Sequence, residues 1–301
     1  MQPHDWSGVF SAITTPFRDD LSVDHAFLAR HVTWLMDHGV RGIVPLGSLG
    51  EGATLSPAEK LEVLATCRRA TKGRVPLVAG IGTLATGDAV ALAREAERLG
   101  CDALMVLPPY VYRGDARETL AHLSAVMDAT PLSCMLYNNP IAYGTDVTPA
   151  QLGLLARHEN LHAVKESSGD IRRVTEIGER HGDRFRVFVG MDDVIVEGMA
   201  AGAVGWIAGL VNALPEESVR LFDLAAAGRV DDTRELYHWF LPLLRLDTVP
   251  KFVQLIKLVQ QEMEMGSARV RPPRLELEGD EREQVLAVIR GRFAALPQRA
   301  A

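Results

Sequence analysis

Short apolar runs alternate with stretches of helical periodicity along the first three quarters of the chain. The runs are almost uniformly apolar, which is typical of strands that are covered on both faces. There are eight such runs: Val9–Thr14, Gly42–Leu46, Val75–Ala79, Ala103–Leu107, Leu132–Leu136, Leu161–Val164, Arg186–Val189 and Ala203–Ala208. Repeated strand-then-helix units predict a parallel sheet, and eight units are the number that closes a TIM (β/α)8 barrel.

Helical periodicity marks the segments between these runs. Clear examples are His25–His38, Pro57–Thr71, Asp88–Leu99 and Glu118–Ala129. The eighth helix is predicted to end near Gly228, and the pattern beyond it is helical only. These last helices are expected at Asp231–Leu246, Val249–Met265 and Asp280–Leu296. We therefore expect an α/β barrel domain over residues 1–228 and a C-terminal helical appendage over residues 229–301.

Composition narrows the class of protein. The chain has 301 residues, of which 47% are hydrophobic, so it can bury a full core. The net charge of −7 and the absence of a basic stripe argue against a nucleic-acid partner. No apolar run reaches the roughly 18 residues of a membrane span, and Met1–Trp6 do not resemble a signal peptide. Cys67, Cys101 and Cys134 form no C-x-x-C pair, which is typical of buried free thiols in a reducing cytoplasm.

Lys165 ends the sixth apolar run and is the first candidate for chemistry. The chain has five lysines and 27 arginines, and only Lys165 stands at the C-terminal tip of a predicted buried strand. A lysine there is either a solvated surface charge or an amine held in the opening of the barrel. Burial lowers the pKa of a lysine amine, and the neutral amine can attack a carbonyl or imine carbon. Asp170 is the candidate N-cap of the helix that follows.

Two other strand ends carry candidate chemistry at the same mouth, where barrels of this kind hold their sites. Residues Gly47–Gly52 allow successive backbone N–H groups to face one concavity that suits an anion such as a carboxylate, although a loop without a ligand is the alternative. Tyr137 lies on the strand next to that of Lys165, so its hydroxyl can reach the same space and move a proton. The alternative is an aromatic residue whose hydroxyl is satisfied elsewhere.

Two weaker patterns are assigned no site. Residues Gly80–Ala85 match the dinucleotide fingerprint. In that motif an acidic residue about 20 positions later stands at the end of the next strand, whereas here the acid, Asp102, stands at the beginning of that strand. Asp192, Asp193 and Glu197 can be interpreted as metal ligands, but acids that open a helix are more simply capping and dipole partners. We therefore predict no metal and no organic cofactor.

Three of these segments, in this order on an eight-unit barrel, resemble the dihydrodipicolinate synthase / N-acetylneuraminate lyase family. They are Gly47-Ser48-Leu49-Gly50-Glu51, Tyr137-Asn138-Asn139-Pro140 and Lys165-Glu166-Ser167-Ser168-Gly169. The resemblance covers nearly the whole chain, including the helical C-terminal part. It implies that Lys165 forms a Schiff base with a small 2-oxo acid and that Tyr137 moves protons.

The same resemblance implies the substrate-binding residues and the assembly. Gly47, Ser48 and the backbone of Leu49 would hold the substrate carboxylate, and Gly190 and Ile207 match positions that line the family's site. Members of the family are usually tetramers built as dimers of dimers, so a homotetramer is expected here.

Three departures from the synthases themselves argue against synthase activity. The synthases have two threonines where this chain has Ser48 and Leu49, so one hydroxyl of their proton relay is absent. Their arginine after the Tyr-Asn-x-Pro turn is replaced by Ala142, which Tyr143 follows. The tyrosine that they donate across the dimer interface aligns with Val111.

A narrower resemblance is to the 1-pyrroline-4-hydroxy-2-carboxylate deaminases of hydroxyproline catabolism. The segments that carry it are Leu21–Asp24, Tyr137–Pro140, Asp146–Pro149, Met191–Val194, Gly205–Ile207 and Ala268–Leu275. It implies conversion of 1-pyrroline-4-hydroxy-2-carboxylate to 2,5-dioxopentanoate and ammonia. The alternatives are a lyase of the same family that makes or cleaves a C–C bond of a 2-oxo acid, and a non-catalytic metabolite-binding barrel.

Overall fold

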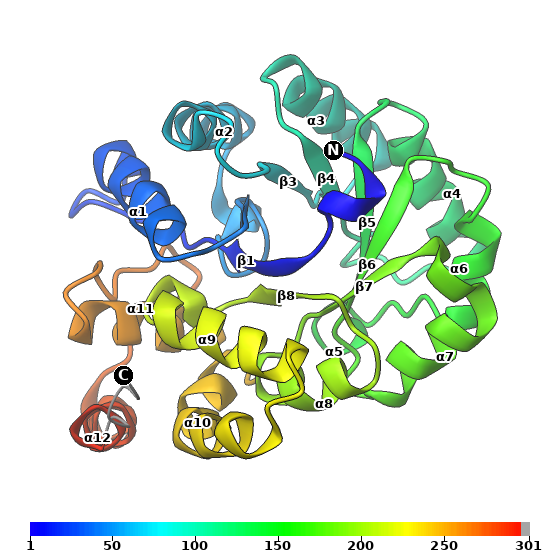
Figure 1. Ribbon diagram of the computed structural model, residues 1–301. Coiled ribbons are helices and arrows are strands. Elements are labelled where there is room, and N and C mark those ends of the chain that lie inside the picture. The colour runs from blue at the N-terminus through cyan, green and yellow to red at the C-terminus, as the bar shows by residue number, and fades with distance from the viewer. Residues whose placement is uncertain (296–301) are drawn as a thin grey trace.

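Eight parallel strands form the centre of the molecule in a computed structural model that describes residues 1–295 (Figure 1). The strands are β1 (Gly8–Ala12), β2 (Gly42–Val44), β3 (Val78–Ile81), β4 (Ala103–Val106), β5 (Ser133–Asn138), β6 (Leu161–Glu166), β7 (Arg186–Val189) and β8 (Gly205–Ala208). Their order is β2-β1-β8-β7-β6-β5-β4-β3, and a parallel bridge between Ile43 and Leu77 joins the two ends. The predicted TIM barrel is confirmed.

Helices surround the strands (Figure 1), and within residues 1–295 three further helices follow the eighth unit. The helices of the barrel are α1 (His25–Asp37), α2 (Pro57–Thr71), α3 (Thr86–Arg98), α4 (Ala116–Met127), α5 (Pro140–Tyr143), α6 (Pro149–Leu155), α7 (Arg172–His181), α8 (Ile195–Ala200) and α9 (Pro215–Ala226). The last three are α10 (Val230–Leu244), α11 (Phe252–Glu262) and α12 (Gly279–Ala294). Short 3-10 turns include η4 (Asp192–Val194), η5 (Leu210–Asn212) and η6 (Arg245–Asp247). The final residue predicted for the last helix, Leu296, lies outside the described residues.

Two local predictions need correction. The third strand begins at Val78 because Pro76 has no N–H for the ladder, although its carbonyl accepts the N–H of Ile43 at 3.0 Å. Helix α7 begins at Arg172, so Asp170 is not its N-cap. The Asp170 carboxylate instead accepts the backbone N–H of Arg172 at 3.1 Å within the turn that precedes the helix.

Aromatic side chains close the barrel at the ends where its strands begin. Trp6 stacks on Phe10, and the edge of Phe188 meets both rings at centroid distances of 5.9 Å and 5.2 Å. The indole N–H of Trp6 donates to the Ser133 hydroxyl at 2.8 Å, so its polar atom is satisfied. A cavity for a ligand is therefore left to the opposite, C-terminal end of the strands.

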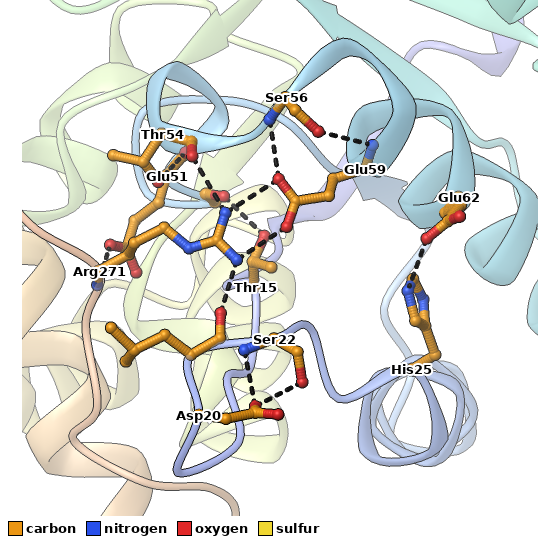
Figure 2. Close-up of polar contacts among 12 residues, drawn as sticks. Thr15, Asp20, Ser22, His25, Glu51, Thr54, Ser56, Glu59, Glu62 and Arg271 are labelled. Carbon is orange, nitrogen blue, oxygen red and sulfur yellow. Dashed lines mark hydrogen bonds and ion pairs between the residues drawn. The ribbon is translucent and has the colours of Figure 1, made fainter.

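Helix α11 joins the barrel through a buried ion pair. The Lys257 amine lies 2.5 Å from the Glu51 carboxylate in the loop after β2, and both side chains are almost fully buried. Arg271 extends this contact, as Figure 2 shows: its backbone N–H donates to Glu51, and its guanidinium forms two hydrogen bonds with Glu59 at 2.8 and 3.0 Å. The C-terminal segment therefore holds the loop after β2.

The boundary that we placed at residue 228, between the barrel domain and the C-terminal helical appendage, stays a prediction.

We expect Glu59→Gln to lower the free energy of unfolding by about 1 kcal/mol at pH 7. The hydrogen bond from Arg271 is the main cause that lowers the pKa of Glu59 to about 2 in the folded protein. A lowered carboxyl pKa stabilises the fold above the unfolded value, and this contribution is lost as the pH falls through the folded pKa. The difference from wild type should therefore shrink in urea titrations as the pH is lowered from 5 towards 2. Glu62→Gln, which removes an exposed carboxylate on the same helix, is the control, and equal effects of the two variants would contradict the prediction.

The structure also bears on two predictions made from the sequence, one for the three cysteines and one for a membrane-spanning helix. Cys67, Cys101 and Cys134 are buried free thiols, as predicted. Burial raises the pKa of each thiol, which keeps it protonated. Within residues 1–295, no helix combines the length and apolar character that a membrane crossing requires.

Candidate active site

A cavity of about 410 Å³ opens at the C-terminal ends of the strands. All seven site residues predicted from the sequence line it: Gly47, Ser48, Leu49, Tyr137, Lys165, Gly190 and Ile207. They come from five strands or the loops that follow them, so the barrel brings together residues that are up to 160 positions apart. Their shared position agrees with the place where (β/α)8 enzymes hold their sites.

Lys165 and Tyr137 lie side by side on two adjacent strands. They pair in the register of β5 and β6, and the Lys165 amine lies 4.1 Å from the centroid of the Tyr137 ring. Lys165 is only 6% exposed and Tyr137 4% exposed, which excludes the alternative of a solvated surface lysine. Gly190 makes room for the lysine stem, because a Cβ atom at residue 190 would lie 2.6 Å from the Lys165 Cε.

The loop after β2 lines the cavity and has unused backbone donors. The carbonyls of Gly47 and Ser48 accept hydrogen bonds within the loop, but the N–H groups of Ser48 and Leu49 donate to no group in the described part of the chain. Leu49 is buried and closes one wall with an apolar side chain. Adjacent free N–H groups at the edge of a cavity can bind an anion such as a carboxylate.

Two phenols stand side by side in this cavity. The Tyr137 hydroxyl accepts a hydrogen bond from the side-chain amide nitrogen of Asn139 at 3.0 Å. The side-chain oxygen of Asn139 accepts the N–H of Ala142 and so caps helix α5. The hydroxyl of Tyr143 is hydrogen-bonded to that of Ser48, and the Tyr137 and Tyr143 rings meet edge to face at 5.8 Å. Burial raises the pKa of Tyr143, so this phenol stays protonated. Tyr143 therefore supplies a hydroxyl next to the position where Leu49 lacks one.

Asn138 fixes the turn that carries these groups. Its amide donates to the carboxylates of Glu166 and Asp146, each at 3.1 Å, and its carbonyl oxygen accepts the N–H of Val147 at 2.9 Å. These contacts tie the end of β5 to the end of β6. The orientation of the Lys165 strand and the Tyr137 strand at the mouth is thus set by a buried polar network.

The prediction for the acidic group after β7 was wrong for Asp192. Its side chain is fully buried and does not cap the helix that it precedes: it accepts the indole N–H of Trp206 at 2.8 Å and the backbone N–H groups of Gly209 and Leu210, at the start of η5. Glu197 accepts the phenol of Tyr237 at 3.0 Å. No group of three or more His, Cys, Asp or Glu side chains in residues 1–295 is arranged to hold a metal ion.

Sequence reasoning assigned no place in the site to several other residues of the cavity wall, and the polar ones among them come from two regions of the chain. Asn139 and Tyr143 follow β5, while Asp247 and Arg274 come from the C-terminal segment. The Oδ1 oxygen of Asp247 is buried and accepts no hydrogen bond from the described residues. A signal for Tyr143 existed in its position just after the Tyr-Asn-Asn-Pro turn. Asp247 and Arg274 follow no strand, so the pattern of strand ends gave no indication of them.

Known proteins share both the sequence and the fold. The model of the dihydrodipicolinate synthetase family matches residues 5–291. The 4-hydroxy-tetrahydrodipicolinate synthase of Methanosphaerula palustris is 33% identical over 287 residues, covering 94% of this chain and 98% of the relative. That of Pelobacter propionicus is 34% identical over 232 residues, covering 77% of this chain and 80% of the relative.

Solved structures agree with these relatives. A dihydrodipicolinate synthase of Bacillus anthracis superposes with a TM-score of 0.91 at 28% identity, covering 95% of this chain and 98% of the other. The chloride-inhibited enzyme of Acinetobacter baumannii, solved as a complex with pyruvate, superposes with a TM-score of 0.90 at 28% identity, covering 95% and 99%. The resemblance drawn from the three motifs is confirmed at the level of the family. This chain belongs to the dihydrodipicolinate synthetase family and is an enzyme of that family, with a lyase type of activity.

Proposed function

We propose that this enzyme deaminates 1-pyrroline-4-hydroxy-2-carboxylate to 2,5-dioxopentanoate and ammonia through a Schiff base on Lys165. The observation that carries the proposal is the buried Lys165 amine beside the Tyr137 ring, in a cavity that also contains the free N–H groups of Ser48 and Leu49. These groups match a substrate with an electrophilic C2 and an adjacent carboxylate. The lysine iminium serves as the electron sink.

The first half of the reaction opens the ring. The neutral Lys165 amine attacks C2 of the cyclic imine, and the C2–N1 bond breaks, so that the ring nitrogen becomes the amine on C5. The loop N–H groups hold the C2 carboxylate while this exchange occurs. The C2 iminium makes a C3 proton acidic, and Tyr137, or a water that it positions, takes this proton to leave an enamine.

The second half releases the nitrogen. The enamine expels the C4 hydroxyl as water, which leaves a C3=C4 double bond conjugated to the iminium. A proton shift moves the unsaturation to C5 and gives an imine there. Hydrolysis at C5 releases ammonia, and hydrolysis at C2 frees Lys165 and the product. One water leaves and two enter, in agreement with net hydrolysis.

One pair of assays tests this function. The purified enzyme should release ammonia and a semialdehyde from the pyrroline, and borohydride with substrate or pyruvate should leave a mass adduct on the Lys165 peptide. Pyruvate release from 4-hydroxy-2-oxo acids without ammonia release would favour the C–C lyase instead. That second candidate is supported by the names of the relatives, which are synthases. No adduct with either compound would favour a metabolite-binding barrel.

Tyr137→Phe should lower kcat about 100-fold and change KM little, because a positioned proton carrier contributes on that scale. The phenylalanine ring still packs beside the Lys165 stem, so the borohydride adduct should form in the variant. Steady-state ammonia release and the adduct are the two measurements. Tyr112→Phe, which alters an exposed phenol, is the matched control. A Tyr137→Phe enzyme with kcat within threefold of wild type would exclude this role.

We also propose a cytoplasmic homotetramer, as the resemblance implies. Exposed apolar side chains in the loops after β4 and β5 support contact with a second copy: Val111 is 84% exposed and Ile141 67%. Light scattering of the purified protein tests the assembly, and a monomer at micromolar concentration would contradict it.

A further inference from the structure

Asp247 places a carboxyl group in the candidate active site. It is the only Asp or Glu among the residues described as lining the cavity, and it shares that lining with Lys165. It approaches the end of β8 closely, because a Cβ atom added at Gly209 would lie 2.1 Å from its Oδ1. That oxygen is buried and has no hydrogen-bond partner in the described chain. A buried polar atom without a partner is costly, so a group that enters the cavity is its natural partner.

A second buried carboxyl, Asp192, indicates which of the two holds a proton. Asp192 accepts hydrogen bonds from three donors, on Trp206, Gly209 and Leu210, and these favour its charged form. Asp247 has no such donors at Oδ1. The groups that act on Asp247 are Asp192 and Asp193, which favour its protonated form, and Lys165, which favours its carboxylate.

Burial is the largest cause of the raised pKa of Asp247, and the charge of Asp192 is the next. A fully buried carboxyl and a neighbouring half-buried one cannot both ionise easily, so one proton remains on the pair. Because Asp192 has the donors, the neutral carboxylic acid is Asp247. Its Oδ1 has no hydrogen-bond partner in the described chain, and the Asp247 side chain lines the cavity, where a substrate oxygen can receive the proton.

We propose that Asp247 is the catalytic acid that protonates the C4 hydroxyl as it leaves. This inference rests on the proposed deamination. In this step the enamine electrons form the C3=C4 bond, the C4–O bond breaks with its electron pair on oxygen, and the Asp247 proton completes a water molecule. The Asp247 carboxylate regains a proton from cavity water before the next turnover. The C3 proton follows a different route, through Tyr137 or its water, so the two residues act in separate steps.

Asp247→Asn tests the assignment with two reactions of the same enzyme. Exchange of deuterium from D2O into the methyl group of pyruvate needs the Schiff base and the loss of a C3 proton but no leaving hydroxyl. Asp247→Asn should keep this exchange within threefold of wild type and lower ammonia release from the pyrroline at least 100-fold. In wild type, kcat should fall as the pH rises through the pKa of the acid, and the residual activity of the variant should lack this limb. Asp183→Asn removes an exposed carboxyl in the turn before β7, at the opposite end of the barrel, and should keep both reactions.

The possible failures point to different errors. Ammonia release within threefold of wild type by Asp247→Asn, or an unchanged basic limb, overturns the acid assignment and leaves the deamination intact. Loss of pyruvate exchange in a folded Asp247→Asn also overturns it, since the carboxyl would then support Lys165. A wild-type enzyme that exchanges pyruvate but releases no ammonia overturns the substrate and this inference together. If Asp247→Asn does not fold, Gly209→Ala displaces the same carboxyl and should give the same split between the two reactions.

Discussion

Lys165→Ala should lower the turnover of the pyrroline at least about 1000-fold while the fold is kept, because no Schiff base can form without the amine. The side chain is a buried stem packed on Tyr137 and Gly190 and forms no ion pair within residues 1–295, so its removal breaks no ion pair. Ammonia release measures the loss, circular dichroism measures the fold, and the borohydride adduct should disappear.

Lys72→Ala is the control for this variant, since Lys72 is an exposed lysine at the end of α2. It should keep both the turnover and the adduct. If Lys165→Ala kept its turnover within tenfold of wild type, a barrier difference of about 1.4 kcal/mol, the covalent route would be wrong.

Lys257→Met should lower the free energy of unfolding by about 3 kcal/mol. Its partner Glu51 is fully buried, and removal of the amine leaves that carboxylate with the Arg271 N–H and a distant Arg274 guanidinium at 3.9 Å. Burial lowers the pKa of Lys257 to about 8, while Glu51 acts in the opposite direction. The charge on the amine thus depends on its partner. Urea denaturation measures the loss.

Lys251→Met provides a matched control, because it removes a lysine from an ion pair with Glu281 whose side chains are about half exposed. This variant should change the stability by less than about 1 kcal/mol. The double variant Glu51→Gln with Lys257→Met should recover part of the loss, since it leaves no unpaired charge in the core. Equal effects of the two single lysine variants would show that the buried pair contributes no more than a surface pair.

Much of the fold was predictable because its signals are local. Each strand is a short apolar run, and α2 begins and ends where the sequence predicts, with Ser56 and Glu59 in a reciprocal capping box. The errors arose where the local backbone departs from the expected pattern. Strand β3 begins later than predicted because of Pro76, and helix α7 begins later than predicted because a turn follows Asp170.

The site was predictable only where it follows the strands. Lys165, Tyr137 and the loop from Gly47 to Leu49 stand at strand ends, so the barrel topology alone places them together. Asp247 is contributed by a 3-10 turn between two helices, and no periodicity marks such a residue as part of a cavity. Asp192 was misassigned because two acids before a helix look like caps, whereas its donors lie on β8 and the loop after it.

The Lys257–Glu51 pair bears on how this enzyme could change its substrate during evolution or design. Glu51 belongs to the loop proposed to bind the carboxylate, while the segment that anchors Glu51 also contributes Asp247 and Arg274 to the cavity wall. Mutations far down the chain can therefore reshape the recognition surface without touching a strand of the barrel. A library that varied only the loops after the strands would leave this half of the surface unexplored, and a hybrid built by exchanging the last third of the chain would carry new specificity with it.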